Sequence, residues 1–278
     1  MDNQIETCHL PLVVGGRARG GRSTQQDHLV CLHDPALDAR LLVVADGMGG
    51  DGAGELAAEG VIHVARQLWQ QGRWREQPGP LFLETLCQKA HLELRRRGRG
   101  LPSGEPHSTV VALLVRGNRV SWAHVGDSRL YRFQGRHCLG QTEDHSLSQL
   151  KVRRGELAAG QVAHDADQHQ LLRGLGGQLP PQVDHGTALL RPGQAFVLCS
   201  DGIWEHLSPD ELGQLARRRD QHRALREAIT LVLERAGEAG DNVALIFFRT
   251  GWAGWLWRRM VRRVDQLARP SRSAESSA

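Results

Sequence analysis

The sequence is short of cysteine and contains no long apolar run. Its five cysteines are odd in number and widely spaced, and none belongs to a Cys-x-x-Cys pair. A disulfide framework and a zinc site are therefore not expected, and a reducing cytoplasm is the natural setting. No apolar run approaches the roughly 20 residues of a membrane-spanning helix. Residues 1–20 also lack the charged-then-apolar pattern of a signal peptide.

Lysine is nearly absent, since Lys89 and Lys151 are the only two, and arginine supplies almost all positive charge. The formal net charge is +4, from 35 basic and 31 acidic residues. Six of these arginines and two of these acids fall in residues 251–278, which leaves 29 of each sign in the rest of the chain. Residues 1–250 thus carry no net charge, and they lack the basic stripe that nucleic-acid binding requires. No nucleic-acid partner is expected.

Short apolar runs and helical periodicities occur in groups along the chain. This grouping is typical of an α+β protein whose antiparallel sheets pack together with helices outside. The sequence Ser208–Glu211 adds a helix start with a serine cap and a proline in the first turn. Strands are predicted at Leu29–Leu32, Leu41–Ala45, Thr109–Val115, Val120–Val125, Ala195–Cys199 and Val243–Phe248, and helices at Gly54–Trp69, Pro80–Arg97, Glu211–Arg217 and Arg223–Arg235.

Four aspartates stand beside a glycine at the end of an apolar run. Asp46, Asp127 and Asp201 follow such a run, and Asp241 precedes one. A single Asp-Gly pair at a strand end is usually only a turn. Four carboxylates gathered at strand ends, however, stay ionised only when cations lie among them. Oxygen ligands without Cys or His favour hard cations such as Mg²⁺ or Mn²⁺.

These aspartates belong to longer strings that follow one another in a fixed order. The string VADGMGG at Val44–Gly50 resembles the signature of bacterial protein phosphatase 2C enzymes, and VGDSRLY at Val125–Tyr131 matches that family closely. The resemblance covers about residues 12–249. It implies a four-layer αββα sandwich, two antiparallel β-sheets flanked by helices, with the metal site at one end. The other matching strings are Arg22–Asp27, Ser108–Thr109, Asp144–Ser146, Leu198–Trp204 and Gly240–Val243.

The resemblance implies which residues hold the metals. Asp46 matches an aspartate that bridges two ions and is catalytic in that role, while Gly47 would offer its backbone carbonyl. Asp201 and Asp241 match the residues that complete the pair. Asp127 matches an aspartate of a weaker third metal site. The implied cofactors are therefore two Mn²⁺ or Mg²⁺ ions per active site, with a third bound more weakly.

The resemblance also implies how the phosphate is held. Arg22 matches a catalytic, substrate-binding arginine, whose planar guanidinium can bind two phosphate oxygens at once. Gln26 and Asp27 match outer-shell residues that contact metal-bound water. Two departures affect this set. Gln25 replaces an asparagine, which alters a local hydrogen bond, and Met48 stands where animal relatives have a histidine proposed as the leaving-group acid, so metal-bound water is the favoured proton donor.

The implied activity is metal-dependent hydrolysis of phosphoserine and phosphothreonine in proteins by a metal-bridging hydroxide, opposing a Ser/Thr kinase. Two alternatives stay open: a catalytically inactive regulator that binds phosphoproteins, and a phosphatase of small phosphoesters. The intact metal positions count against the inactive regulator. The expected partners are a phosphorylated protein and its cognate kinase, and the expected state is a monomer.

The domain prediction places a protein phosphatase 2C-like catalytic domain at residues 1–250, with a variable flap at about 146–180. In the flap, Arg153, Arg154 and Arg173 could contact an acidic substrate, with a solvated charged surface as the alternative. Just before it, His145 is expected to bridge loops by hydrogen bonds.

A basic, Trp-rich extension follows at residues 251–278. On a helix its apolar residues would share one face with arginines elsewhere, which predicts contact with a membrane surface or a partner through 251–268. Packing on the body or a frayed terminus is the alternative. The predicted location is cytoplasmic, with peripheral contact to the inner membrane through this extension. The apolar face comprises Trp252, Leu256, Met260, Val264 and Leu267.

Overall fold

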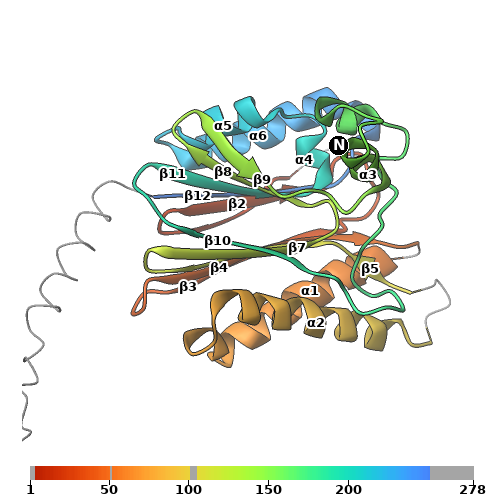
Figure 1. Cartoon of the computed structure of the whole chain (residues 1–278). Coiled ribbons are helices and arrows are strands. Elements are labelled where there is room, and N and C mark those ends of the chain that lie inside the picture. The colour runs from red at the N-terminus through yellow and green to blue at the C-terminus, as the bar shows by residue number, and fades with distance from the viewer. Residues whose placement is uncertain (1–3, 51, 101–104, 251–278) are drawn as a thin grey trace, which may run out of the picture.

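The structure is a computed structural model that describes residues 4–50, 52–100 and 105–250. Two antiparallel sheets pack face to face, and helices cover both outer faces (Figure 1). The predicted α+β sandwich of four layers is therefore confirmed. The predicted extension at 251–278, with its contact segment 251–268, lies outside the described residues, so the domain boundary at 250 stays a prediction.

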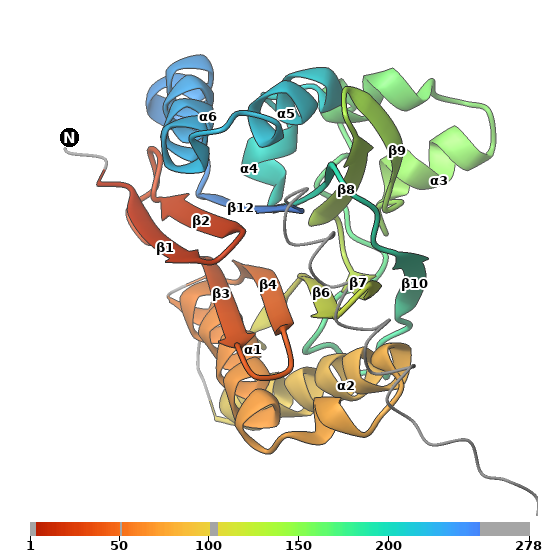
Figure 2. The same cartoon turned by 90° about the vertical axis from the view of Figure 1, so that its left-hand side faces the viewer.

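The first sheet has the strand order β1-β2-β12-β11-β8-β9, and three helices lie on its outer face (Figure 2). The strands are β1 (Glu6–Leu10), β2 (Val13–Ala18), β8 (Arg129–Gln134), β9 (His137–Gln141), β11 (Gln194–Cys199) and β12 (Val243–Arg249). The helices are α4 (Asp201–Trp204), α5 (Pro209–Ala216) and α6 (Gln221–Ala236).

The second sheet has the strand order β10-β7-β6-β4-β3, with the short β5 paired to β4. Helices α1 (Ala53–Gln70) and α2 (Gly79–Gly98) cover its outer face (Figure 2). Its strands are β3 (Asp27–Asp34), β4 (Ala39–Met48), β5 (His107–Ser108), β6 (Val110–Arg116), β7 (Arg119–Val125) and β10 (Asp184–Leu189).

Central strands are apolar on both sides because each sheet packs against helices on one face and against the other sheet on the opposite face. Along β4, Leu41 and Val43 pack in the core beneath α1 and α2, whereas Leu42 and Val44 pack in the core between the sheets. Successive side chains of a strand point to opposite faces, so this alternation assigns each residue to one layer. The result is a continuous run of buried apolar residues along β4, which explains why this strand could be predicted from the sequence.

All four helices and six strands predicted from the sequence are present, but β1, β2, β5, β8, β9 and β10 were not predicted. The glycines of β2 explain one omission. A Cβ added at Gly16 would lie 3.0 Å from Leu225 and 3.1 Å from Ile229, both on α6. Glycine usually argues against a strand, but here it lets a helix pack closely onto the sheet.

The flap contains α3 (Leu147–Arg153) and a 3₁₀ helix (Ala159–His164), followed by a long loop. Both lie within the flap predicted at about 146–180. Further 3₁₀ turns lie at Arg73–Arg75 and Gly237–Ala239. Within the described ranges, no helix combines the length and apolarity needed to cross a membrane. All five cysteines carry free thiols.

Candidate metal centre and active-site pocket

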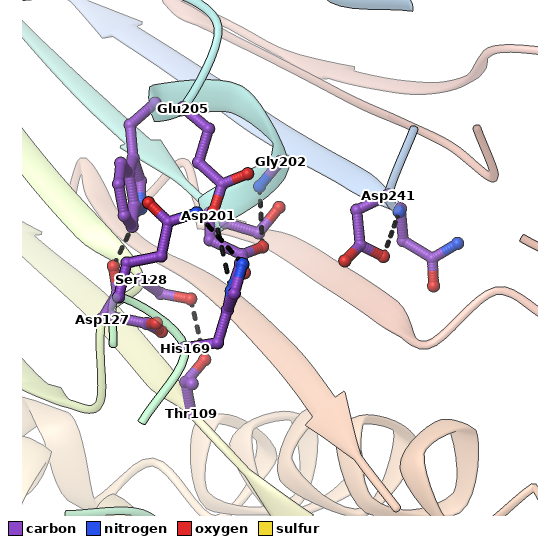
Figure 3. A network of polar contacts seen from close by, with 12 residues as sticks. Thr109, Asp127, Ser128, His169, Asp201, Gly202, Glu205 and Asp241 are labelled. Carbon is purple, nitrogen blue, oxygen red and sulfur yellow. Dashed lines mark hydrogen bonds and ion pairs between the residues drawn. The ribbon is translucent and has the colours of Figure 1, made fainter. Parts of the chain in front are cut away.

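A pocket of about 420 Å³ lies at one end of the sandwich, where segments from both sheets meet. Asp46 from β4, Asp127 after β7, Asp201 at the start of α4 and Asp241 before β12 all line it. Figure 3 shows Asp127 and Asp201 near His169, with Asp241 to the right of this group. The structure thus brings the four predicted aspartates together with Gly47. Arg22, Gln26, His169, Leu171 and Asn242 also contribute to the lining.

The backbone of Asp46 is fixed by the Ser108–Thr109 pair. The Ser108 hydroxyl and the Thr109 N–H both donate to the Asp46 carbonyl oxygen, at 2.9 and 2.8 Å. In return, the Asp46 N–H donates to Thr109 Oγ1 at 3.2 Å, and that hydroxyl shares a 2.7 Å hydrogen bond with Ser128. Two neighbouring hydroxyl residues therefore hold the end of β4, which gives this sequence motif a structural reason.

Gly47 is required because α1 begins directly against it. A Cβ at this position would lie 1.9 Å from the carbonyl oxygen of Gly54, a backbone atom that cannot move independently. The Gly47 N–H donates to the Gln26 carbonyl at 3.1 Å, which connects the two pocket segments. The Asp-Gly pair thus combines a carboxylate with a close helix approach.

Asp27 lies behind Asp46, directly opposite it in the β3–β4 register. Only 1% of Asp27 is exposed, and its Oδ2 accepts a 2.5 Å hydrogen bond from the Ser200 hydroxyl. Burial raises the pKa of Asp27 well above its ordinary value, and the negative charge of Asp201 raises it further. Of the two predicted outer-shell residues, Gln26 lines the pocket and Asp27 sits behind it.

Asp127 is held by a buried aromatic and ionic cluster. Its carbonyl accepts a 3.0 Å hydrogen bond from Trp204 Nε1, and the Arg129 guanidinium lies 3.6 Å over the Trp204 ring. Arg129 also forms a two-pronged ion pair with Asp144, at 2.8 and 2.6 Å. Among the described residues, the buried Oδ1 of Asp127 has no hydrogen-bond partner. Such an atom costs free energy unless a ligand satisfies it.

Arg22 lies at the edge of the pocket with a side chain that is 55% exposed. Its guanidinium donates to Asp241 Oδ2 at 2.6 Å, which points its charge toward the carboxylates. The other oxygen of Asp241 accepts from the Asn242 N–H at 2.7 Å. Arg22 therefore places a positive charge at the rim of the pocket, against Asp241.

Asn242 anchors the loop that carries Arg22. Its side-chain amide donates to the carbonyls of Arg19 and Thr24 at 2.7 and 3.0 Å. Its Oδ1 accepts from the Gln26 N–H at 2.7 Å. At the departure from the family pattern, the Gln25 Oε1 accepts a hydrogen bond from the Asp27 N–H at 3.0 Å.

The carboxylates of the pocket impose a strong electrostatic penalty on one another. Burial raises the pKa of Asp46 and of Asp127 well above the ordinary value, and Asp201 is the next cause in each case. Cations among the carboxylates would relieve this penalty. The donors are oxygen atoms, and Asp127 Oδ1 lacks a partner, so the residues fit hard divalent cations such as Mg²⁺ or Mn²⁺.

Two further residues at this pocket were missed by the sequence analysis. His169 of the flap places Nδ1 3.8 Å from Asp201 Oδ2 and 3.7 Å from Glu205 Oε1 (Figure 3). The contact with Asp201 raises the pKa of His169 to about 9, and burial followed by Asp201 raises that of Glu205 to about 7. A divalent cation on Asp201 would compete with His169 for the same carboxylate. Glu205 directly follows a recognised motif, whereas no motif contains His169.

The flap and its neighbours are tied down by polar contacts. His145 Nδ1 accepts from the Gly126 N–H at 3.2 Å, and its ring stacks on His124 with centroids 4.6 Å apart. The hydrogen bond between His145 and Gly126 bridges two loops, as predicted. Arg173 pairs with Asp184 at 3.0 Å, and Arg153 pairs with Glu143 at 2.7 Å. Both of these flap arginines are therefore already engaged in ion pairs.

Comparison with known proteins agrees with this geometry. The family model described as protein phosphatase 2C matches residues 14–242. The serine/threonine phosphatase Stp of Listeria monocytogenes is 28% identical over 219 residues, covering 74% of this chain and 82% of that protein. The crystal structure of the Mycobacterium tuberculosis serine/threonine phosphatase PstP/Ppp has a TM-score of 0.76 and 25% identity, covering 86% of this chain and 98% of that one.

A second structure, of the PstP catalytic domain, has a similar fold. The catalytic domain of that phosphatase, in complex with two manganese ions, has a TM-score of 0.71 and 24% identity, covering 86% of this chain and 97% of that one. At this identity the likeness shows the fold alone. The family match spans most of the chain, so this protein belongs to the protein phosphatase 2C family.

Proposed function

We propose that this chain is a metal-dependent protein phosphatase that hydrolyses phosphoserine and phosphothreonine. The observation that supports this most is the convergence of four aspartates and one arginine on a single pocket. Membership of the family and the similarity to named serine/threonine phosphatases point the same way. An oxygen-rich pocket with an arginine at its edge suits a phosphate ester held against cations.

In this proposal Asp46, Asp201 and Asp241, with the Gly47 carbonyl, hold two Mn²⁺ or Mg²⁺ ions. Asp127 would serve a third, more weakly bound ion, since its free Oδ1 faces no other partner among the described residues. When bound, such cations lower the pKa of water and neutralise charge on phosphate oxygens. The PstP complex with two manganese ions supports this choice of cofactor.

The remaining pocket residues bind and orient the substrate. Arg22 would exchange its ion pair with Asp241 for two oxygens of the incoming phosphate. Asn242 keeps the Arg22 loop in place through three hydrogen bonds. Gln26, whose side-chain amide donates to the Gly49 carbonyl at 3.3 Å, and Asp27 complete the outer shell.

The biological setting follows from the same proposal. The substrate would be a phosphorylated protein, and a cognate Ser/Thr kinase would supply it. We infer that the chain acts as a monomer in the cytoplasm. Contact with the inner-membrane surface or a partner through 251–268 is part of this proposal and rests on the sequence alone.

The proposal is tested with a phosphothreonine peptide and Mn²⁺, Mg²⁺ or EDTA. Phosphate release should require a metal and should fall at least 100-fold in Asp201→Asn, because that change removes a ligand charge. Asp210→Asn, an exposed aspartate at the start of α5, is the matched control and should retain activity. Sugar phosphates and nucleotides should be poor substrates.

Two results would redirect the proposal. A folded protein that releases no phosphate under any metal would instead favour the inactive phosphoprotein-binding regulator. Faster hydrolysis of sugar phosphates than of phosphopeptides would favour the phosphatase of small phosphoesters.

A further inference from the structure

A second cavity adjoins the metal pocket on the side of the flap. Its volume is about 720 Å³, which is within the usual range of ligand sites. We call it the flap groove. Its lining includes Met48, His107, Leu171, Leu172, Leu179 and Pro180.

The flap groove is open to solvent and exposes more apolar than polar surface, although His107, His169, Gln178 and Gln182 also line it. Leu172 is 55% exposed and Leu179 is 81% exposed, although both are large apolar side chains. No acidic residue lines the groove within the described part of the chain. Its one arginine, Arg173, is already paired with Asp184 at 3.0 Å. An apolar surface left uncovered beside a binding site marks a place where another apolar group docks.

The flap groove is adjacent to the metal pocket. Met48, His169 and Leu171 line both cavities. A peptide whose phosphorylated side chain reaches the metal pocket must extend away from it at about 3.3–3.6 Å per residue. Residues a few positions from the phosphorylated one therefore lie within reach of the groove.

Resting on the proposed function, we propose that the flap groove binds an apolar side chain of the substrate protein near its phosphorylated residue. The prolines at 180 and 181 limit the backbone freedom of one wall, which lowers the entropy lost on binding. The substrate class is thus a phosphoserine or phosphothreonine protein with leucine or a similar residue within three positions. Leu172 and Leu179 determine this specificity.

The experiment uses the full chain with Mn²⁺ and a set of phosphothreonine peptides. One peptide has alanine throughout, and the others carry a single leucine at each of three positions on either side. Leucine at one or two positions should raise kcat/KM about tenfold, as expected for partial burial of one leucine. In the double variant Leu172→Ser/Leu179→Ser, the ratio of kcat/KM for the leucine peptide to kcat/KM for the alanine peptide should be close to one.

The matched control is Leu139→Ser, which replaces a 45% exposed leucine on β9 and should keep the preference. The inference is wrong if no position gives more than about a twofold preference, or if the preference survives in the double variant. If the double variant hydrolyses the alanine peptide and the leucine peptides faster than wild type by the same factor, another part of the chain or a second copy covers the groove, and the inference is also wrong. Failure to hydrolyse even the alanine peptide would instead overturn the proposed function.

Discussion

The environment of His145 contributes to how the protein responds to acid. The side chain is 3% exposed and lies against His124, with Asp184 and Arg173 nearby. Burial is the main cause that lowers the pKa of His145 to about 4, and the neighbouring His124 lowers it further. The ring is therefore neutral in the folded protein, and its Nδ1 can accept the Gly126 N–H.

Acidification should destabilise the protein through His145. The unfolded chain takes up a proton near pH 6.5, whereas the folded chain does so only near pH 4, so stability is lost as pH falls between these values. The loss at pH 5 should be about 1–2 kcal/mol. His145→Asn keeps an acceptor for Gly126 without titrating.

Urea unfolding of the metal-free protein at pH 7.5 and pH 5 measures this effect. The difference in unfolding free energy between wild type and His145→Asn should narrow at pH 5, and His63→Asn, at an exposed site, is the matched substitution control. A difference that is the same at both pH values would show that His145 does not titrate as argued. Groups that do not interact with His145 titrate alike in both proteins and cancel in the comparison, whereas the pKa of Asp184 depends on His145.

At the residue scale, the sequence could predict the aspartates but not their neighbours. Asp46 and Asp201 are marked by adjacent glycines and apolar runs, which are local signals. His169 has no such signal, because its contact with Asp201 depends on how the flap returns to the pocket. The pairing of Asp27 with Ser200, 173 positions apart, is likewise a product of tertiary structure.

At the scale of elements, the loop between β2 and β3 depends on a residue at the other end of the chain. Asn242 contacts Arg19, Thr24 and Gln26, and only 3% of it is exposed. These three hydrogen bonds satisfy backbone groups that the loop cannot satisfy itself. We call these three hydrogen bonds of Asn242 the clamp. The clamp therefore sets the position of Arg22 relative to Asp241.

Asn242→Ala should loosen this loop. Leaving buried backbone groups unpaired should cost about 2–3 kcal/mol of stability, and kcat/KM for a phosphopeptide should fall at least tenfold because Arg22 is no longer held. Ser208→Ala, which removes the hydrogen-bonded cap of α5, should cost about 1 kcal/mol without lowering kcat/KM. If Asn242→Ala loses stability while kcat/KM stays at the wild-type value, the clamp has no part in positioning Arg22.

Elements with one apolar run were predictable, and strands whose apolar run is broken by glycine, arginine or exposed positions were not. Strands β4, β11 and β12 are buried on both faces and stand out in the sequence. In contrast, β9 is an exposed edge strand, and the buried Arg129 of β8 is tolerated only because Asp144 pairs with it. Neither the exposure nor the pairing is visible without the tertiary structure.

At the scale of the whole molecule, the metal pocket connects the two sheets. Asp46 belongs to the second sheet, Asp201 and Asp241 adjoin strands of the first, and Asp127 lies in the connection from β7 to β8. Without cations the pKa of Asp46 is raised, first by burial and then by the negative charge of Asp201 across the junction. Cations would therefore join the two halves as well as serve catalysis.

Mn²⁺ should accordingly stabilise the folded protein. At a metal concentration about 100 times Kd, the gain is about 2.7 kcal/mol, which corresponds to a rise in Tm of roughly 5–10 °C for a domain of this size. Thermal unfolding with EDTA or Mn²⁺ measures this shift without relying on activity. Asp201→Asn should lose most of the shift, and Asp210→Asn should keep it. A shift of equal size in Asp201→Asn would place the stabilising ion elsewhere, and no shift in wild type would contradict the role of cations between the sheets.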